Sequence, residues 1–437
     1  MKKKLFYIIS IALIVMLATF TFSACKKETS KYVSFTMPMG EDGTFKILQL
    51  TDLHFINSTV ENKQNLSKDY TYRDEWAMTA ITDIIQRADP DLIMVTGDTT
   101  FTLDEIYYLT RTSDNYAAFQ KMAKFIDSFG IPWAFLFGNH DEEGSLYDRF
   151  KSVEKTKKVL GAYLNSDEIK HCLYNDGPDE INGVGNYIIN VVNKDGSTNM
   201  PLVLFDSGSY LRNIKDEENG QTYSDQHAYE WVHDDQLDWY EAAINDISRI
   251  EKKKVASMVF QHIPMPVYQT VIDAAVATLG DNWKDTINAS WTYGQELKLN
   301  TSIGEITYYG GVCNEENHAV CSSYIGTFHG HTYDGGHEFE RLLSVGSTKY
   351  VFCGHDHRNT FSFTYQGIRL SYGMSIDYSA NGIVPPPFAD NQNIFAETEQ
   401  RGGTLITLKK DSSVSISQIP FTRDLYQETL REKGLEK

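Results

Sequence analysis

Five short polar motifs in this chain combine carboxylate, imidazole and amide side chains, which are the groups that bind hard and borderline metal ions. They are Asp52-Leu53-His54, Gly97-Asp98, Gly138-Asn139-His140-Asp141, Gln261-His262 and Gly354-His355-Asp356-His357. Each motif follows an apolar run of the length expected for a buried strand. Because residues i and i+2 of an extended segment point the same way, Asp52 with His54 and His355 with His357 can each reach one centre.

This set of candidate ligands is too large for one metal ion and suits two. If Asp98 bridges, one ion would take Asp52, His54 and His357, and the other would take Asn139, His262 and His355. Each motif alone is weak evidence, because a polar residue after a strand is more often part of a solvated turn or a hydrogen-bonded core. The order of all five motifs, each after an apolar run, carries the prediction of a dinuclear site.

Predicted strands and helices alternate along the chain, and their packing would have to bring these motifs together. Predicted strands are Phe45–Leu50, Leu92–Val95, Trp133–Phe137, Tyr187–Val192, Leu202–Phe205, Val255–Phe260, Tyr350–Phe352, Thr360–Thr364, Ile368–Ser371, Thr404–Leu408 and Val414–Ile419, and predicted helices are Glu75–Arg87, Tyr116–Phe129 and Asp235–Ile250. Such alternation favours an α/β fold with buried parallel strands and chemistry at their carboxyl ends. Residues 265–348 are polar and contain glycine, which predicts an irregular insertion.

The five motifs, in this order, resemble those of the calcineurin-like metallophosphoesterases. The segments Asn139–Gly144, Gly183–Tyr187, Asp235–Trp239, Phe260–Pro264 and Cys353–His357 also resemble the purple-acid-phosphatase-like branch of that family. The resemblance covers residues 44–420. It implies a four-layer α/β/β/α sandwich, in which two mixed sheets are flanked by helices and the dinuclear site lies at the strand ends.

Two positions depart from the purple acid phosphatases. Those enzymes carry glycine where this chain has His54, and a ligand tyrosine where it has Phe101. Phenylalanine cannot bind a metal ion, so the purple chromophore should be absent, and His54 is available to supply the missing ligand. The two ions could therefore be manganese, zinc or iron.

The resemblance implies an enzyme that hydrolyses a phosphomonoester by in-line attack of water activated between the two ions. It also implies that His140 contacts the phosphate and protonates the leaving oxygen. Asp141 is included with His140 among the predicted catalytic residues, and for Asp141 and Asp356 we expect a role in orienting imidazoles. One alternative is a phosphodiesterase or nuclease with the same metal site, which would need a longer groove with basic contacts. Another is a surface binding protein without metals, although all seven candidate ligands are present.

The N-terminus and the charge indicate where the protein works. Lys2 to Lys4 precede the apolar run Leu5–Phe22, which ends in Ser23-Ala24-Cys25. This pattern predicts a bacterial lipoprotein signal of residues 1–24, with lipid on the Cys25 thiol; an uncleaved anchor and a plain secretory signal are the alternatives. All three place the body outside the cytoplasm.

The chain carries 40 basic and 59 acidic side chains, for a net charge of −19. Removal of residues 1–24 would remove three lysines and no acid and give −22. Such a charge repels polyanions, so we expect no general nucleic-acid binding. The expected partners are a phosphate-ester substrate and, through the lipid, the membrane; no protein partner is predicted. The remaining organisation is a tether at 25–43, a domain at 44–420 and a tail at 421–437.

Two cysteines and a group of histidines outside the five motifs could also have a role. Cys313 and Cys321 could pair in an oxidising compartment. Phe328-His329-Gly330-His331, with His337, looks like a metal motif but follows no apolar strand. For these histidines we predict a loop or a wall of the substrate pocket.

Overall fold

Two stacked sheets form the centre of the computed structural model, which describes residues 28–56, 71–102, 114–216, 219–287, 296–313, 320–329, 331–377, 401–421 and 423–432. The larger sheet has, in spatial order, β1 (Phe35–Pro38), β5 (Tyr187–Val192), β6 (Thr198–Leu204), β9 (Ser257–Phe260), β14 (Thr348–Cys353), β16 (Ile368–Tyr372), β15 (Ser362–Tyr365), β11 (Gly304–Tyr308) and β10 (Leu297–Thr301). The smaller sheet has β18 (Val414–Pro420), β17 (Gly402–Lys409), β2 (Thr44–Leu50), β3 (Leu92–Thr96) and β4 (Trp133–Leu136).

Both sheets are mixed, with a parallel centre. The strands β2, β3 and β4 run parallel in the smaller sheet, and β6, β9, β14 and β16 run parallel in the larger one. Antiparallel neighbours, such as β17 beside β2 and β15 beside β16, extend these centres toward the sheet edges. The carboxyl ends of parallel neighbours lie at one edge of their sheet, which is where α/β proteins usually place their chemistry.

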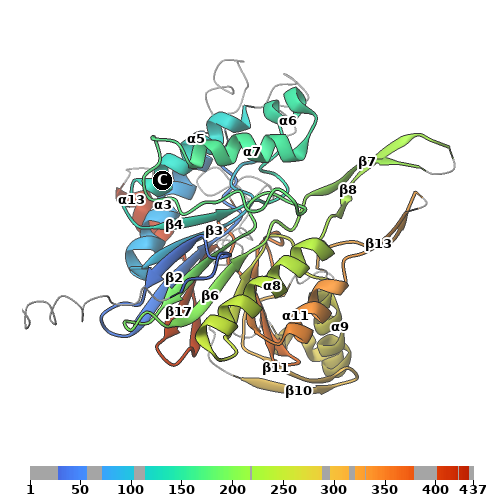
Figure 1. Ribbon diagram of the computed structural model, residues 1–437. Coiled ribbons are helices and arrows are strands. Elements are labelled where there is room, and N and C mark those ends of the chain that lie inside the picture. Colours follow the sequence, from blue (N-terminus) through green and yellow to red (C-terminus); the bar gives the residue numbers. More distant parts are fainter. Residues whose placement is uncertain are drawn as a thin grey trace, which may run out of the picture.

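Helices cover the outer face of each sheet (Figure 1). The smaller sheet is covered by α3 (Thr71–Ala88) and α5 (Asn115–Asp127), with α6 (Ser145–Phe150) and α7 (Val153–Leu164) beside them; the larger is covered by α8 (Asp234–Glu251), α9 (Val267–Leu279) and α11 (His337–Val345).

Alternate residues of the larger sheet enter different cores. Ile189 and Met258 pack in the cluster shared with the smaller sheet, whereas Ile188 and Val259 pack with α8 and α9. This period of two is what a strand buried on both faces requires. The predicted four-layer α/β/β/α sandwich is therefore confirmed.

The helices form for reasons that the sequence makes visible. The side chain of Asp114 caps α5 by accepting a hydrogen bond from the backbone N–H of Ala117. Such a cap contributes about 1 kcal/mol. In α8, Leu237, Tyr240 and Ile244 recur every three or four residues and are buried. That spacing gives one apolar face, which packs on the larger sheet.

Residues 265–348 are more regular than the sequence predicted. They contain α9, the short helices η1 (Gly280–Asn282) and α10 (Trp283–Ile287), the hairpin of β10 and β11, and α11. β11 pairs with β15, and β10 is the edge strand of the larger sheet, a strand in which only Leu299 is fully buried. An edge strand such as β10 therefore lacks the continuous apolar run by which buried strands are recognised.

The predicted tether and tail also contain regular structure. Within the tether, β1 pairs in parallel with β5, and Phe35 lies opposite Ile189. Within the tail, α13 spans Arg423–Glu432. The predicted signal and Cys25 lie outside the described residues, and within the described residues no helix is both long enough and apolar enough to cross a membrane.

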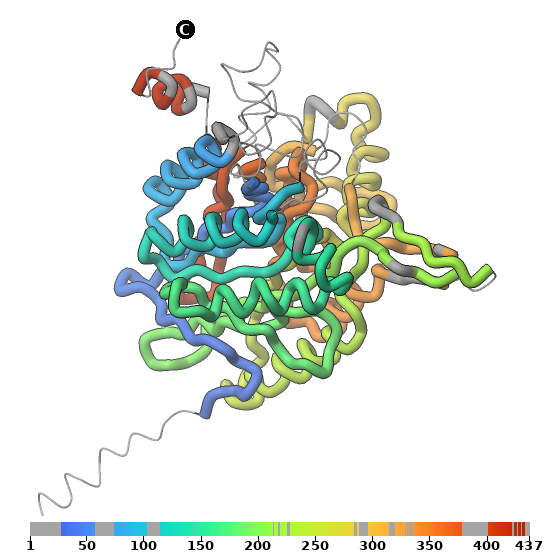
Figure 2. The backbone as a smooth tube through the Cα atoms, turned by 90° about the horizontal axis from the view of Figure 1, so that it is seen from above, coloured from blue at the N-terminus to red at the C-terminus, as the bar shows by residue number. Residues whose placement is uncertain are grey.

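Two hairpins project together from the body and are called the arm here (Figures 1 and 2). They are β7 (Tyr210–Lys215) with β8 (Thr222–Tyr229), and β12 (Ile325–Phe328) with β13 (His331–Asp334). The backbone N–H of Tyr324 donates to the carbonyl of Tyr229 at 3.0 Å, so the two hairpins are joined at their base.

Candidate metal centre

The candidate ligands gather where parallel strands of both sheets end. Asp52 follows β2, Asp98 follows β3 and Asn139 follows β4; His262 follows β9, and His355 with His357 follows β14. The side chains are deeply placed, since Asp52, His54, Asp98, Asn139 and His262 are each at most 1 % exposed. The fold therefore brings together residues separated by about three hundred positions.

Unusual backbone conformations aim several of these side chains. Asp52, His54, Asp98 and His355 all have positive φ, at 53°, 50°, 48° and 74°. Residues other than glycine rarely adopt this region, and such strain is concentrated at functional sites. The segment from Asp52 to His54 is thus not the extended strand that the sequence predicted.

Glycine lets two of the loops approach closely. A Cβ atom on Gly138 would lie 2.2 Å from Oδ1 of Asp98, so no larger residue fits there without a shift of the loop.

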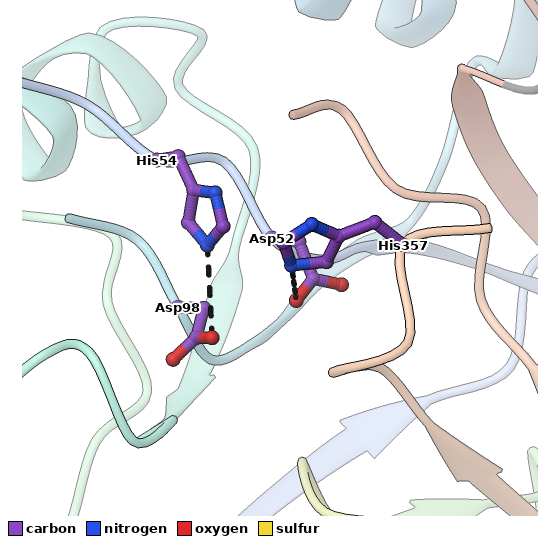
Figure 3. A group of neighbouring side chains, drawn as sticks. All are labelled: Asp52, His54, Asp98 and His357. Atoms are coloured by element: carbon purple, nitrogen blue, oxygen red, sulfur yellow. Dashed lines mark ion pairs between the residues drawn. The ribbon is translucent and has the colours of Figure 1, made fainter. Parts of the chain in front are cut away.

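One group contains Asp52, His54, Asp98 and His357, whose ligand atoms all lie within 4.8 Å of one another. Nε2 of His54 is 3.6 Å from Oδ2 of Asp98, and Nε2 of His357 is 3.3 Å from Oδ1 of Asp52 (Figure 3). These are the four residues that the ligand types suggested for one ion.

A second group contains Asp98, His262 and His355, again within 4.8 Å. Nε2 of His262 lies 3.1 Å from Oδ2 of Asp98. The same oxygen thus faces imidazoles of both groups. The other oxygen of Asp98 accepts the backbone N–H of His140 at 2.8 Å, which fixes the carboxylate in this position.

Buried polar atoms without hydrogen bonds indicate what the two groups could hold. Within the described residues, no hydrogen bond reaches Nε2 of His54, Nε2 of His262, Oδ2 of Asp98, Oδ1 of Asn139 or either ring nitrogen of His355. Buried polar atoms nearly always have a partner. Imidazole nitrogen together with carboxylate and amide oxygen suits zinc, manganese or iron, so the residues fit two metal ions that share Asp98.

Asp377 orients two of the imidazoles and was missed by the sequence analysis. Its two carboxylate oxygens lie 2.9 Å from Nδ1 of His54 and 3.0 Å from Nδ1 of His357. Nδ1 of His262 in turn donates to the carbonyl of Thr96 at 2.9 Å. Outer contacts of this kind leave Nε2 of each ring facing the site. The available signal was position, because Asp377 follows β16 just as the other residues follow their strands.

The buried acidic and imidazole side chains of the site shift one another's pKa values. Burial alone would raise the pKa of Asp98, but the imidazoles of His262 and His140 lower it well below its ordinary value. Burial lowers the pKa of His262, yet Asp98 raises it to about 9. Burial and the neighbouring His262 lower the pKa of His355 to about 3. These shifts favour an ionised Asp98 carboxylate and a neutral His355 imidazole.

Comparison with known proteins identifies the family. The sequence model described as calcineurin-like phosphoesterase matches residues 45–359, which is well over half of the chain. The chain belongs to the calcineurin-like phosphoesterase family. The predicted resemblance is therefore confirmed.

Curated relatives and a solved structure carry related names. "Probable inactive purple acid phosphatase 14" of Arabidopsis thaliana is 26 % identical over 392 residues, which cover 86 % of this chain and 82 % of that protein. "Probable inactive purple acid phosphatase 28" of the same plant is 27 % identical, with 78 % and 72 % covered. The crystal structure of a dimetal phosphatase from Danio rerio has a TM-score of 0.41 and 12 % identity, and the match covers 86 % of this chain and 96 % of that chain.

His140 and Asn139 lie against the base of the arm. Nδ2 of Asn139 donates to the hydroxyl group of Tyr210 at 2.7 Å, which leaves Oδ1 of the same amide for the site. Nδ1 of His140 lies 3.0 Å from Oε1 of Glu143, and its Nε2 lies 4.0 Å from Oδ2 of Asp98. The His140 side chain is 20 % exposed, which makes it accessible to a substrate.

Within the described residues, the hydrogen bonds of Asp141 and Asp356 go to backbone, hydroxyl and amide groups, not to the imidazoles that the sequence suggested. Asp141 accepts backbone N–H groups of Thr99 and Gly138, both at 2.8 Å, and so joins the loop after β3 to the loop after β4. Asp356 accepts the backbone N–H of Cys321 and the hydroxyl of Tyr372. Both aspartates hold loops in place, and Asp141, predicted as catalytic, is 2 % exposed.

Phe101 occupies the position of the missing tyrosine ligand. Its ring centroid lies 5.1 Å from that of His54 and 5.0 Å from that of His140. An apolar ring here packs against two site imidazoles without offering a ligand atom.

His329, His331 and His337 belong to neither ligand group. His329 lies in the turn of its hairpin, as the predicted loop requires. It stacks on Tyr223 and lies 2.8 Å from the Asp216 carboxylate, and His331 contacts the carbonyl of Lys215, so these two histidines join the hairpins of the arm. His337 begins α11. No disulfide joins Cys313, which is buried, to Cys321, which is exposed.

Proposed function

We propose that this chain is an extracytoplasmic phosphatase that hydrolyses a phosphomonoester with two metal ions, which are manganese, zinc or iron. The observation that carries the proposal is the shared Asp98 carboxylate, which lies in both groups of candidate ligands. A complete ligand set of this kind argues against a metal-free binding protein, despite the names of the relatives.

A hollow of about 440 Å³ opens over the ligands. Its lining residues are Asp98, Phe101, Asn139, His140, Tyr229, Cys321, His355, Asp356, His357 and Arg358. When bound, two metal ions would activate water and withdraw charge from the phosphoryl oxygens. The oxygen of water, having lost a proton, forms a bond to phosphorus as the bond between phosphorus and the leaving oxygen breaks, and the leaving oxygen takes up a proton.

His140 is the group that we assign to protonation of the leaving oxygen. Burial lowers the pKa of this imidazole, but the carboxylates of Glu143 and Asp98 raise it to about 9. In the metal-free site these carboxylates therefore favour the protonated ring, and Glu143 would still contact it when metal ions are bound. General acid catalysis of this kind is worth roughly 10² to 10⁴ in rate.

The location of the protein is proposed from its N-terminal residues alone. Lys2 to Lys4, the apolar run and Cys25 support a signal that is cleaved before Cys25, with lipid on the thiol as a membrane anchor. A phosphate ester outside the cytoplasm would then be the substrate.

The test combines elemental analysis with turnover. The purified protein should contain two equivalents of metal and hydrolyse 4-nitrophenyl phosphate faster than bis(4-nitrophenyl) phosphate, and Asp98→Asn should lose both metal and activity. Asp127→Asn is the matched control, because Asp127 is also a hydrogen-bonded aspartate but contacts Trp133 at the start of β4. Faster cleavage of the diester would favour the phosphodiesterase alternative. Absence of both metal and turnover would favour a binding protein.

A further inference from the structure

A second hollow adjoins the one above the ligands and is called the side groove here. It has a volume of about 500 Å³. Its lining residues are Tyr229, Pro266, Gln269, Thr270, Asp273, Val320, Cys321, Ser322, Ser323, Tyr324 and Ile325. Tyr229 and Cys321 line both hollows. A molecule whose phosphate lies over the ligands can therefore extend past these two residues into the side groove.

The wall of the side groove is fastened to the loops that carry the ligands. Residues 320–325 make a series of hydrogen bonds through their backbone N–H groups: Val320 to Oε1 of Gln269 at 2.7 Å, Cys321 to Oδ2 of Asp356 at 3.0 Å, Ser323 to the carbonyl of Pro264 at 3.1 Å and Tyr324 to the carbonyl of Tyr229 at 3.0 Å. Pro264 follows His262 by two residues, and Asp356 lies between His355 and His357. The groove thus holds a fixed position relative to both ligand groups.

Tyr229 connects the groove to the ligands directly. Its ring stands edge-on to the ring of His355, with centroids 4.4 Å apart. The same ring lies 5.4 Å from the ring of Tyr210, which contacts Asn139. A group that packs on Tyr229 would therefore lie next to the reacting phosphate.

The side chains of the groove have a distinct chemical character. Tyr229 and Tyr324 supply aromatic rings, and Ile325 is 55 % exposed. Gln269, Thr270, Ser322 and Ser323 add neutral hydrogen-bonding groups. The hydroxyl of Ser323, a residue only 3 % exposed, has no hydrogen-bond partner within the described residues.

We propose that the side groove binds the leaving group of the ester and that this group is a neutral alcohol that contains a ring, such as a sugar or a nucleoside. Flat rings pack favourably on tyrosine, and the hydroxyl and amide groups can bind the polar edge of the ring. The carboxylate of Asp273 would repel a second anionic group on the same side. This inference rests on the proposed phosphatase function.

Two substrates with matched chemistry test the role of the ring. Benzyl phosphate and methyl phosphate release alcohols of similar acidity, so a difference between them reports binding of the ring. The wild-type kcat/KM should be about tenfold higher for benzyl phosphate. Tyr324→Ala should remove that difference, mainly through a higher KM, and leave the value for methyl phosphate unchanged.

A pair of lysine variants tests the role of charge. Thr270 and Thr278 both lie exposed on α9 and both hydrogen-bond a carbonyl of their own helix, but only Thr270 lines the groove. Thr270→Lys should raise kcat/KM for pyrophosphate about tenfold relative to wild type. Thr278→Lys should have no effect.

The outcomes separate the two proposals. If the metal-loaded wild type hydrolyses neither benzyl phosphate nor methyl phosphate, the proposed function fails. If it hydrolyses both equally well, or prefers pyrophosphate, the phosphatase stands and the assignment of the side groove is wrong. Equal effects of Thr270→Lys and Thr278→Lys would also contradict that assignment.

Discussion

The hydroxyl group of Tyr210 lies 2.7 Å from Nδ2 of Asn139 and accepts its hydrogen bond. An amide side chain can turn either its oxygen or its nitrogen toward a metal ion, but only the oxygen is a ligand. Because the tyrosine takes up the NH₂ group, the oxygen of Asn139 faces the site. Tyr210 begins β7, so the base of the arm sets the orientation of a candidate ligand.

The first prediction concerns this contact. Tyr210→Phe removes the acceptor and lets the amide of Asn139 turn. The variant should bind one of its two Mn²⁺ ions about 10–100-fold more weakly, with activity restored at high Mn²⁺. Isothermal titration calorimetry of the metal-free protein measures the affinity.

Tyr223→Phe serves as the control for this prediction. Tyr223 lies on β8 of the same hairpin, and its hydroxyl contacts Gln221 near the tip. The Tyr223→Phe variant should bind both ions with wild-type affinity. If Tyr210→Phe also did so, the orientation of Asn139 would not depend on the tyrosine.

The second prediction concerns the aspartate that contacts two imidazoles. Asp377→Asn keeps the shape of the side chain but cannot accept hydrogen bonds from both His54 and His357. We expect a loss of about 10–100-fold in metal affinity and a matching loss of activity at limiting metal. Metal content after dialysis measures the effect, with Asp127→Asn as the control. Full retention of metal by Asp377→Asn would contradict the assigned role.

The third prediction concerns a buried ion pair away from the ligands. Nζ of Lys157 on α7 lies 2.8 and 3.0 Å from the two carboxylate oxygens of Asp206, and both side chains are 2 % exposed. Lys157→Met would leave the carboxylate without its partner and should lower the free energy of unfolding by about 3–5 kcal/mol. Urea denaturation measures it. Lys158→Met, at the more exposed neighbouring position, should change stability by less than about 1 kcal/mol.

The fourth prediction is a dependence of stability on pH. Glu338 is buried in the first turn of α11, and burial raises its pKa from 4.5 to about 8, although a hydrogen bond from Gln261 opposes the shift. Between these values the folded chain keeps a proton that the unfolded chain has lost, so stability should fall as the pH rises from about 4.5 to about 8. The fall should be complete above that range.

Glu338→Gln stays neutral throughout and should lose less stability over that range than wild type does. Urea denaturation at about pH 5 and about pH 8 measures the difference. Glu340→Gln, at an exposed position of the same helix, is the control and should follow the wild type. A parallel decline in Glu338→Gln and wild type would show that another group governs the dependence.

The central strands and the candidate ligands could be predicted from the sequence because their signals are local. Leu92–Val95 is an unbroken apolar run, and Gly97-Asp98 follows it directly, so both the buried strand and the turn are visible in a few residues. The same holds for Asn139 and His355. Such segments must be apolar because they are covered on both faces.

The missed features depend on contacts between distant residues. Asp377 lies four residues after Gly373 with no histidine beside it, and only the fold brings it to His54. Tyr210 has the same character, since nothing near it in the sequence indicates Asn139. The edge strands in residues 265–348 bury one face only, and the sequence pattern there was too weak to distinguish them from loops.

Loops that follow strands of both sheets contribute side chains to the candidate metal centre. Asp52, His54, Asp98 and Asn139 come from the smaller sheet, and His262, His355 and His357, with the supporting Asp377, come from the larger. Metal ions bound by residues of both sheets would link one sheet to the other. Binding of the ions by the protein should therefore raise the temperature at which the two sheets separate. Separation of the sheets would in turn release both ions together.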